Sequence, residues 1–120
     1  MKGLDIQMKA SNFNSNFEIL TKRDQTHPED IERMALFIII AGNEDLFEKA
    51  RYIYDFEDHS IIPEVLDSES VDFCGSSRAL VKLGYNLFNG FPADVMETFR
   101  RLDDDNYALA MAAIKKRFRG

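Results

Sequence analysis

Cysteine is almost absent from this chain of 120 residues, and it has no long hydrophobic run. Cys74 is the only cysteine, which excludes an intramolecular disulfide and is typical of a reducing compartment. The longest apolar run, residues 34–41, has eight residues, whereas a membrane-spanning helix needs roughly 20. The first residues lack the apolar run of a signal peptide. We therefore expect a soluble cytoplasmic protein.

The sequence also lacks a basic excess and the short motifs that carry a specific chemistry. Its 21 acids outnumber 15 Lys and Arg, whereas direct binding of a nucleic-acid duplex requires a basic footprint. No phosphate-binding glycine loop, CxxC pair or HxxxH pair is present. Three consecutive Asp at 103–105 could hold Mg²⁺ only beside phosphate-binding machinery. These absences argue against nucleic-acid binding as the main role and favour a protein that is not an enzyme.

Apolar residues are numerous enough for one compact domain. Hydrophobic residues make up 45% of the chain, and ten residues are Phe. A folded chain of this size buries roughly two thirds of the surface that its unfolded form exposes. No linker rich in Pro, Gly or Ser divides the sequence. We expect a single helical domain over residues 12–120, preceded by a flexible lead-in over residues 1–11.

Apolar residues recur at helical spacing through most of this domain and predict an all-α fold of five to six helices. Thr26 is the predicted N-terminal cap of the second helix, with Glu29 three residues later. This helix is apolar nearly all round, so we expect it to be the central, buried helix. Asn43 is the predicted cap of the third helix. Gly84 is the predicted point of close approach between two helices. Only residues 61–62 and 71–73 are candidates for strands. The predicted helices cover approximately residues 12–22, 26–41, 43–54, 76–89, 92–102 and 103–118.

The last two predicted helices have apolar residues that we expect to face the core. Spacing at i, i+3, i+4 and i+7 places such residues on one face of a helix. Asp103 is the predicted cap of the last helix, which ends in a cluster of Lys and Arg where the helix dipole favours positive charge. The residues predicted to face inward are Val95, Met96 and Phe99, and then Tyr107, Ala110, Met111, Ile114 and Phe118.

The strongest charge feature is an acidic segment, residues 52–77, which contains seven acids and no Lys or Arg. It accounts for more than the whole negative excess of the chain, whose formal net charge is −6. We predict an ordered loop between the third and fourth main helices, with Phe56 and Phe73 as candidate exposed anchors. Its acids either attract a positively charged partner or only solvate the loop. The predicted partner-binding residues are Asp55, Glu57, Asp58, Glu64, Asp67 and Glu69.

Four residues have the chemistry of zinc ligands: His27, His59, Cys74 and Asp30. They come from separate parts of the sequence, so such a site would be structural and would join the acidic segment to the central helix. His27 and Asp30 alone could instead serve a metal-dependent hydrolase. Cys74 precedes a helix start, where the dipole lowers the pKa of a thiol and can make it a nucleophile. Ordinary capping, surface or half-buried roles also explain each residue.

Five stretches of the chain form a recognisable set: THPEDIERMALF and AGNEDLF (26–37 and 41–47), IYDFE (53–57), SSRALVKLGYNLFNG (76–90) and LDDDNYALA (102–110). They resemble a family of small proteins of unknown function from Gram-positive bacteria and their phages. The resemblance covers roughly residues 17–118 and includes no catalytic residues. It implies a phage or mobile-element setting, in which many small acidic proteins inhibit host defence. An anti-CRISPR protein against Cas9 is one such possibility.

The residues and the resemblance together predict a non-enzymatic acidic binding protein that inhibits a host defence or nucleic-acid-handling protein. Its predicted partner is a host protein with a basic surface, such as a Cas9-type effector, in the host cytoplasm. Neither nucleic acid nor a membrane is the expected main partner. The alternatives are a protein with a structural zinc site and a metal-dependent hydrolase, and zinc is the one cofactor that the residues suggest.

Overall fold

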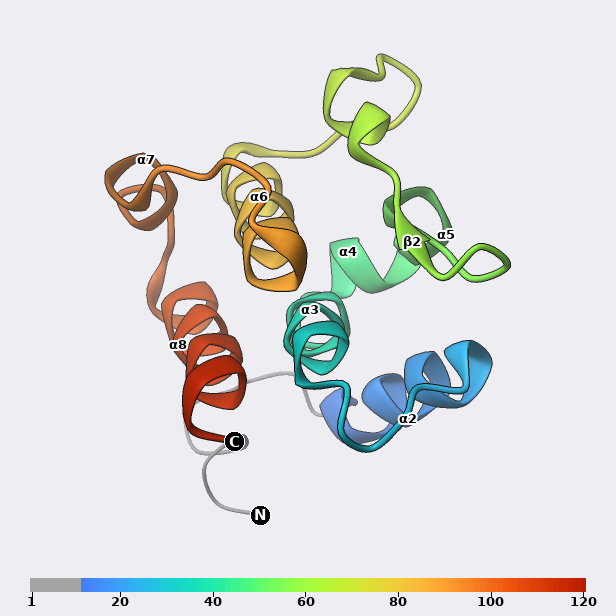
Figure 1. Cartoon of the computed structure of the whole chain (residues 1–120). Helices are drawn as coiled ribbons and strands as arrows, with labels where there is room; N and C mark the ends of the chain where they lie inside the picture. The colour runs from blue at the N-terminus through green and yellow to red at the C-terminus, as the bar shows by residue number, and fades with distance from the viewer. Residues whose placement is uncertain (1–11) are drawn as a thin grey trace.

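The fold is built around α3 (Ile31–Ala41), in which every residue from position 35 to position 41 is buried. In the computed structural model, which describes residues 12–120, three other long helices contact α3. They are α2 (Phe13–Asp24), α6 (Gly75–Asn89) and α8 (Asp104–Arg119), and Figure 1 shows them arranged around α3. An apolar run without a polar face predicts this central position, which is confirmed. The predicted lead-in, residues 1–11, lies outside the described residues.

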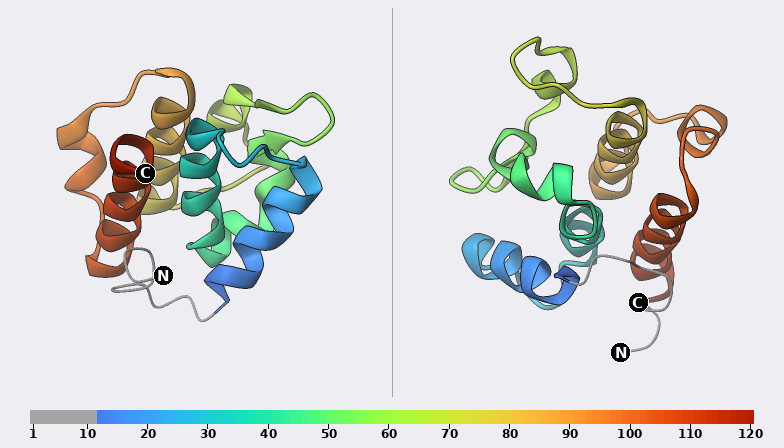
Figure 2. Two further views of the ribbon diagram at one scale, coloured as in Figure 1. Left: turned by 60° about the horizontal axis from the view of Figure 1, so that its bottom comes forward. Right: turned by 180° about the vertical axis from the view of Figure 1, so that it is seen from behind.

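Short elements connect the long helices. Two views in Figure 2 show the hairpin and α7 at the periphery of the bundle, whereas α4 lies beside α3. Strands β1 and β2 pair antiparallel, with Tyr54 opposite Ile61. The mostly helical single domain is confirmed, whereas the hairpin is an addition, because two-residue strands are too short to show an alternating pattern. The short elements are α4 (Glu44–Glu48), α5 (Ala50–Ile53), β1 (Tyr54–Asp55), β2 (Ser60–Ile61), the 3₁₀ helix η1 (Pro63–Asp67) and α7 (Val95–Phe99).

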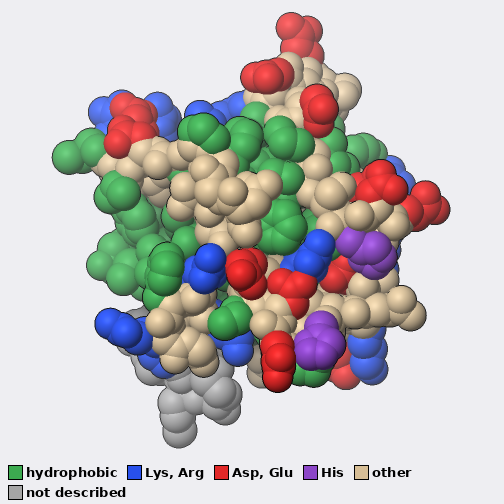
Figure 3. Space-filling view, viewed as in Figure 1, with side chains coloured by type: hydrophobic (Ala, Val, Ile, Leu, Met, Phe, Trp, Pro, Cys, Tyr) green, Lys and Arg blue, Asp and Glu red, His purple; other side chains and the backbone are tan. Residues whose placement is uncertain are grey.

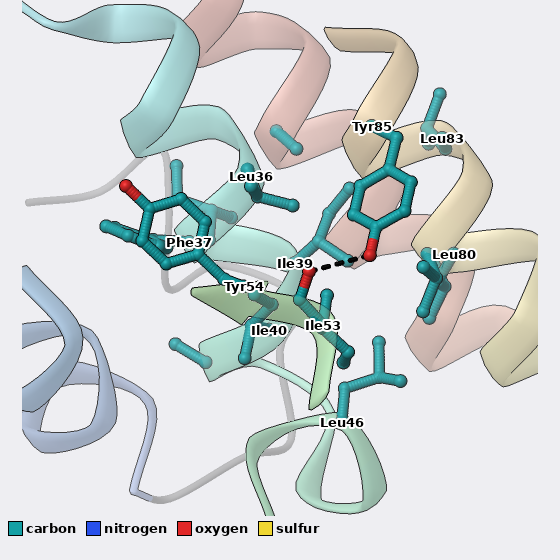
Figure 4. Close-up of a cluster of buried hydrophobic side chains, with 14 of the residues drawn as sticks. Leu36, Phe37, Ile39, Ile40, Leu46, Ile53, Tyr54, Leu80, Leu83 and Tyr85 are labelled. Carbon is teal, nitrogen blue, oxygen red and sulfur yellow. Dashed lines mark hydrogen bonds between the residues drawn. The ribbon is translucent and has the colours of Figure 1, made fainter. Parts of the chain in front are cut away.

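The core joins α3 to α6 and to the segment before the hairpin (Figure 4). The buried hydroxyl of Tyr85 donates to the backbone oxygens of Ile53, at 2.6 Å, and of Ile62, at 3.1 Å. This side chain therefore holds both ends of the hairpin segment against α6. A Cβ atom added at Gly84 would lie 2.8 Å from Cδ1 of Leu36, so the predicted close approach of two helices at Gly84 is confirmed. Across residues 12–120, no helix is long and apolar enough to cross a membrane.

Several predicted helix starts were wrong by a few residues. Thr26 does not cap α3; Asp30 does, accepting a hydrogen bond from the backbone N–H of Arg33 at 3.1 Å. The predicted helix over 43–54 is divided into α4 and α5 at Lys49. The helix predicted over 92–102 is only the short α7. It begins after Pro92, at Val95, because Asp94 is its cap. Caps at Asn43 and Asp103 are confirmed, since each side chain accepts a backbone N–H.

The inward faces predicted for the last two helices were wrong in part. Val95 and Met96 of α7 are exposed, and so are Tyr107, Met111 and Phe118 of α8. The face of α8 that packs on the core is instead made of small residues and one Leu, because small side chains let helix axes approach closely. Gly42 leaves the space that Leu109 occupies at this contact. The buried residues of α8 are Leu109, Ala110, Ala112 and Ala113.

Candidate functional site

The six predicted partner-binding acids lie on two projecting loops. Asp55, Glu57 and Asp58 belong to the β1–β2 hairpin, and the other three lie in η1 and the loop that follows it. All are exposed except Asp55, which is half-buried. In Figure 3 acidic side chains gather at the top of the molecule and at its right side, where Figure 1 draws these two loops. We call these six residues the acidic surface: Asp55, Glu57, Asp58, Glu64, Asp67 and Glu69.

Within residues 12–120, no Lys or Arg forms an ion pair with any residue of the acidic surface. Elsewhere acids often pair with a neighbouring base: Glu18 contacts Lys22 at 3.0 Å, and Asp45 contacts Lys49 at 2.8 Å. Asp55 has a local role as well, because its Oδ1 accepts the backbone N–H groups of the next two acids in the hairpin turn. Within the described residues, the negative charge of the acidic surface is therefore not neutralised by a base.

Phe56 and Phe73 are not exposed anchors, which corrects that interpretation. Phe73 is buried, and the half-buried Phe56 stacks on Phe37 with ring centroids 6.1 Å apart. Phe56 is also covered by the guanidinium of Arg23, 4.3 Å from its ring centroid. These two rings fix the two loops to the core. A partner of the acidic surface would therefore contact its carboxylates rather than these two rings.

The hairpin is fastened to the bundle by Asp24, the last residue of α2, whose side chain is 2% exposed. Its Oδ1 accepts hydrogen bonds from the hydroxyl of Tyr54 at 2.6 Å and from Nδ1 of His59 at 2.7 Å. Its Oδ2 accepts from Oγ1 of Thr26 at 2.6 Å. Tyr54 begins β1 and His59 immediately precedes β2. One buried carboxylate thus holds both strands of the hairpin.

Arg33 completes this network from α3. Its Nε donates to the hydroxyl oxygen of Tyr54 at 2.7 Å, and Nη2 donates to the backbone oxygen of His59 at 2.6 Å. Nη1 pairs with Asp30, the cap of α3. The guanidinium also lies over the ring of Phe88, 5.0 Å from its centroid. The Asp24 network, made of Asp24, Thr26, Arg33, Tyr54 and His59, therefore connects α2, α3 and the hairpin.

The electrostatics of the Asp24 network favour an ionised carboxylate. Burial alone would raise the pKa of Asp24, but hydrogen bonds from Thr26, Tyr54 and His59 and the charge of Arg33 outweigh burial and lower it. Burial, reinforced by the Asp24 carboxylate, raises the pKa of Tyr54, so that its hydroxyl remains a donor. Because an ionised carboxylate only accepts hydrogen bonds, His59 donates from Nδ1.

The structure brings three of the four predicted zinc ligands to one place and leaves the fourth elsewhere. His27, Asp30 and His59 line a shallow hollow of about 300 Å³ beside the Asp24 network, and Figure 3 shows both histidines on the same face. Cys74 does not line this hollow; it caps α6. Over the described part of the chain, no group of three or more His, Cys, Asp or Glu is arranged to hold a metal ion. The predicted four-ligand zinc set is therefore not assembled.

Two of the side chains that would serve a metal or a hydrolase in this hollow already have partners within the chain. Nδ1 of His27 accepts the backbone N–H of Glu29 at 3.0 Å. Asp30 caps α3 and pairs with Arg33, whose positive charge repels a cation. A hydrolase that uses His27 and Asp30 stays a prediction, and the geometry adds no support for it.

Cys74 is exposed at the start of α6. Its sulfur lies 3.4 Å from the hydroxyl oxygens of both Ser76 and Ser77. Hydrogen bonds from these two residues lower the pKa of the Cys74 thiol to about 7. The lowered thiol pKa that we predicted from the helix dipole is thus caused mainly by hydrogen bonds from Ser76 and Ser77. Neither histidine is among its partners, so residues 12–120 contain no Cys–His pair for nucleophilic catalysis.

Sequence reasoning did not identify the Asp24 network. One signal was present: Asp24 is an acid at the C-terminal end of a helix, where the dipole disfavours negative charge. A second was Arg33 in the first turn of an otherwise apolar helix. Each signal indicates a partner from another part of the chain, but neither says which part. Only the folded chain brings Tyr54 and His59 to them.

The fold and these surfaces define a small, mostly helical domain that carries two acidic loops. The chain belongs to a family of unknown function, DUF6075, whose profile matches residues 4–120. This match confirms family membership and extends it beyond the residues that carried the resemblance. The bacterial and phage setting stays a prediction. No curated protein and no solved structure matches the chain.

Proposed function

We propose that this protein is a non-enzymatic binding protein whose acidic surface docks on a basic surface of another protein. The observation that carries the proposal is that six acids project on two loops and none has an ion-pair partner within the described residues. Concentrated charge of one sign attracts a partner of opposite charge over long range and speeds its association. Acids that only solvated a loop would not require a rigid support.

The rigidity of both loops supports a binding role. The Asp24 network and the Tyr85 hydroxyl hold the hairpin. The second loop is held by Lys49, which donates to the backbone oxygen of Asp72, and by Arg78, which donates to that of Leu66. A surface that is ordered before binding loses less conformational entropy on association. The acidic surface is therefore pre-organised for a partner of complementary shape and charge.

Proteins that handle nucleic acid are the partner class that fits best. Their binding grooves carry Lys and Arg arranged to meet phosphates, and a rigid array of carboxylates can occupy such a groove. The protein would then inhibit its partner by competing with nucleic acid. With the resemblance to phage and bacterial proteins, this reasoning favours a host defence protein, and a Cas9-type effector is one candidate.

Three acid-to-lysine changes test this function. The variant E57K/D58K/E69K places bases on both loops, and the control E18K/E29K/E48K makes the same change of net charge at exposed acids outside the acidic surface. Binding to a purified Cas9-type effector, and to partners captured by cross-linking in bacterial lysate and then purified, is measured by interferometry at two salt concentrations. We expect the affinity of the first variant to fall by about tenfold or more, and the control to bind nearly as well as the native protein.

Affinity that is equal for the native protein and E57K/D58K/E69K would refute the acidic surface as the binding site. An equal loss in both variants would show that net charge alone, and not this surface, drives binding. Competition is checked separately, because a bound protein that leaves the partner's nucleic-acid binding unchanged would contradict the inhibitory mechanism.

A further inference from the structure

Helix α8 has a second apolar face, directed away from the core. Tyr107, Met111, Ile114 and Phe118 follow one another at intervals of four, three and four residues, which places them along one line of the helix. Tyr107 is 51% exposed, Met111 41% and Phe118 62%, and Ile114 is half-buried. We call these four residues the α8 stripe. The core-facing residues of α8 lie on the opposite side of the helix.

Helix α7 extends the α8 stripe. The rings of Phe99 and Tyr107 meet edge to face with centroids 5.9 Å apart, and Val95 and Met96 beside them are 73% and 70% exposed. In Figure 3 hydrophobic side chains gather on the left side of the molecule, where Figure 1 draws α7 and α8. Large exposed side chains that stand singly are normal on a surface, whereas a continuous patch marks an interaction site.

The spacing of the α8 stripe indicates what covers it. Intervals of four, three and four residues are those of the seam between two packed helices. Charge along α8 is also divided: Asp104 lies at its start, and Lys115 and Arg119 lie near its end. Two copies of α8 placed antiparallel would therefore bring the acidic end of each beside the basic end of the other. The helix dipoles favour the same orientation.

We propose that α8 packs antiparallel on α8 of a second copy of this chain, forming a two-fold symmetric dimer along the α8 stripe. In this arrangement Tyr107 of one copy lies near Phe118 of the other. Val95 and Met96 enlarge the contact at the Tyr107 end of each helix. Figure 1 draws α8 on the side away from the hairpin, so a dimer would present two acidic surfaces. The proposal does not depend on the function assigned to those surfaces.

Sedimentation velocity of the full chain over a range of concentrations tests the dimer. We expect a concentration-dependent monomer–dimer equilibrium. M111D places a charge in the middle of the seam and should weaken dimerisation by about tenfold or more. The matched control is I19D, because Ile19 of α2 is exposed to the same extent as Tyr107 but lies outside the α8 stripe. The control should dimerise like the native protein.

A charge exchange tests the antiparallel orientation. D104K and R119E each place like charges at both ends of the seam and should weaken the dimer, whereas D104K/R119E restores opposite charges and should recover it. A native chain that sediments as a monomer at every concentration overturns the proposal, as does a dimer that M111D leaves intact. A monomer whose melting temperature falls in M111D but not in I19D would show that the stripe is covered within one chain, which also overturns it.

Discussion

The hydroxyl of Tyr54, the first residue of β1, donates a 2.6 Å hydrogen bond to the carboxylate of Asp24, the last residue of α2. The same hydroxyl oxygen accepts a hydrogen bond from Arg33 at 2.7 Å. The neutral hydroxyl of Tyr54 therefore connects the buried carboxylate of Asp24 on α2 to the guanidinium of Arg33 on α3. This relationship fixes the hairpin that carries half of the acidic surface.

Replacement of Asp24 by Asn should lower the free energy of unfolding by about 2–4 kcal/mol. An amide in place of the carboxylate leaves Arg33 without a buried counter-charge and presents an NH₂ group to donors. The measurement is chemical denaturation followed by circular dichroism. As a control, D58N changes an exposed acid of the hairpin tip and should cost less than about 0.5 kcal/mol. Equal stability of D24N and native protein would show that the network is not a structural tether.

The contribution of Asp24 should depend on pH in a defined direction. Its folded-state pKa is lowered, so between the folded and unfolded values the unfolded chain binds more protons, and stability rises with pH. The difference in unfolding free energy between native protein and D24N should therefore be full above about pH 5 and should shrink as the pH falls below about 4. A difference that stays constant down to pH 2.5 would contradict the lowered pKa.

Replacement of Gly84 by Val should destabilise the bundle by about 2 kcal/mol or more. The Cβ atom alone would lie 2.8 Å from Cδ1 of the fully buried Leu36 and 3.6 Å from Cδ1 of the fully buried Ile39. Unfolding in urea measures the effect. K82V on the exposed side of the same helix controls for helix propensity and should cost about 0.5 kcal/mol. Similar losses in both variants would show that α3 and α6 do not meet closely at Gly84.

Alkylation of Cys74 by iodoacetamide should show a midpoint near pH 7, because hydroxyl groups of Ser76 and Ser77 stabilise the thiolate. The rate should rise with pH through this midpoint, since the thiolate is the nucleophile. S76A removes one of these hydrogen bonds and should move the midpoint to higher pH. Because Cys74 is the only cysteine, the measured alkylation rate reports on this residue alone. A native midpoint at 8.5 or above would contradict the lowered pKa.

Local signals predicted the four long helices, because caps and apolar periodicity act over a few residues. They misplaced the start of α3 and did not separate α4 from α5. Asn43 and Asp103 cap helices as expected, and Gly84 marks the predicted close approach. The hairpin escaped prediction because the hydrogen bonds that stabilise it come from Asp24 and Arg33, more than 20 residues away along the chain. The zinc set was predicted from residue types alone, and residue types do not specify which side chains meet.

The sequence also did not show which apolar face of α8 packs on the core. Tyr107, Met111 and Phe118 have the spacing of a core face, but α8 turns its alanines toward α3 and α6 instead. Periodicity reports that a helix has an apolar face, and when a helix has two such faces it does not report which one the chain itself covers.

The sequence by itself determined the helical class, the central position of α3, the acidic character of residues 52–77 and the caps at Asn43 and Asp103, because these follow from composition and short-range spacing. Only the tertiary structure decided that Asp24 holds the hairpin, that Phe56 and Phe73 are turned inward, that Cys74 stays apart from both histidines, and that α8 presents its larger side chains to solvent. Each of these outcomes depends on contacts between segments far apart in the chain, where packing and the pairing of buried charges select one arrangement among many.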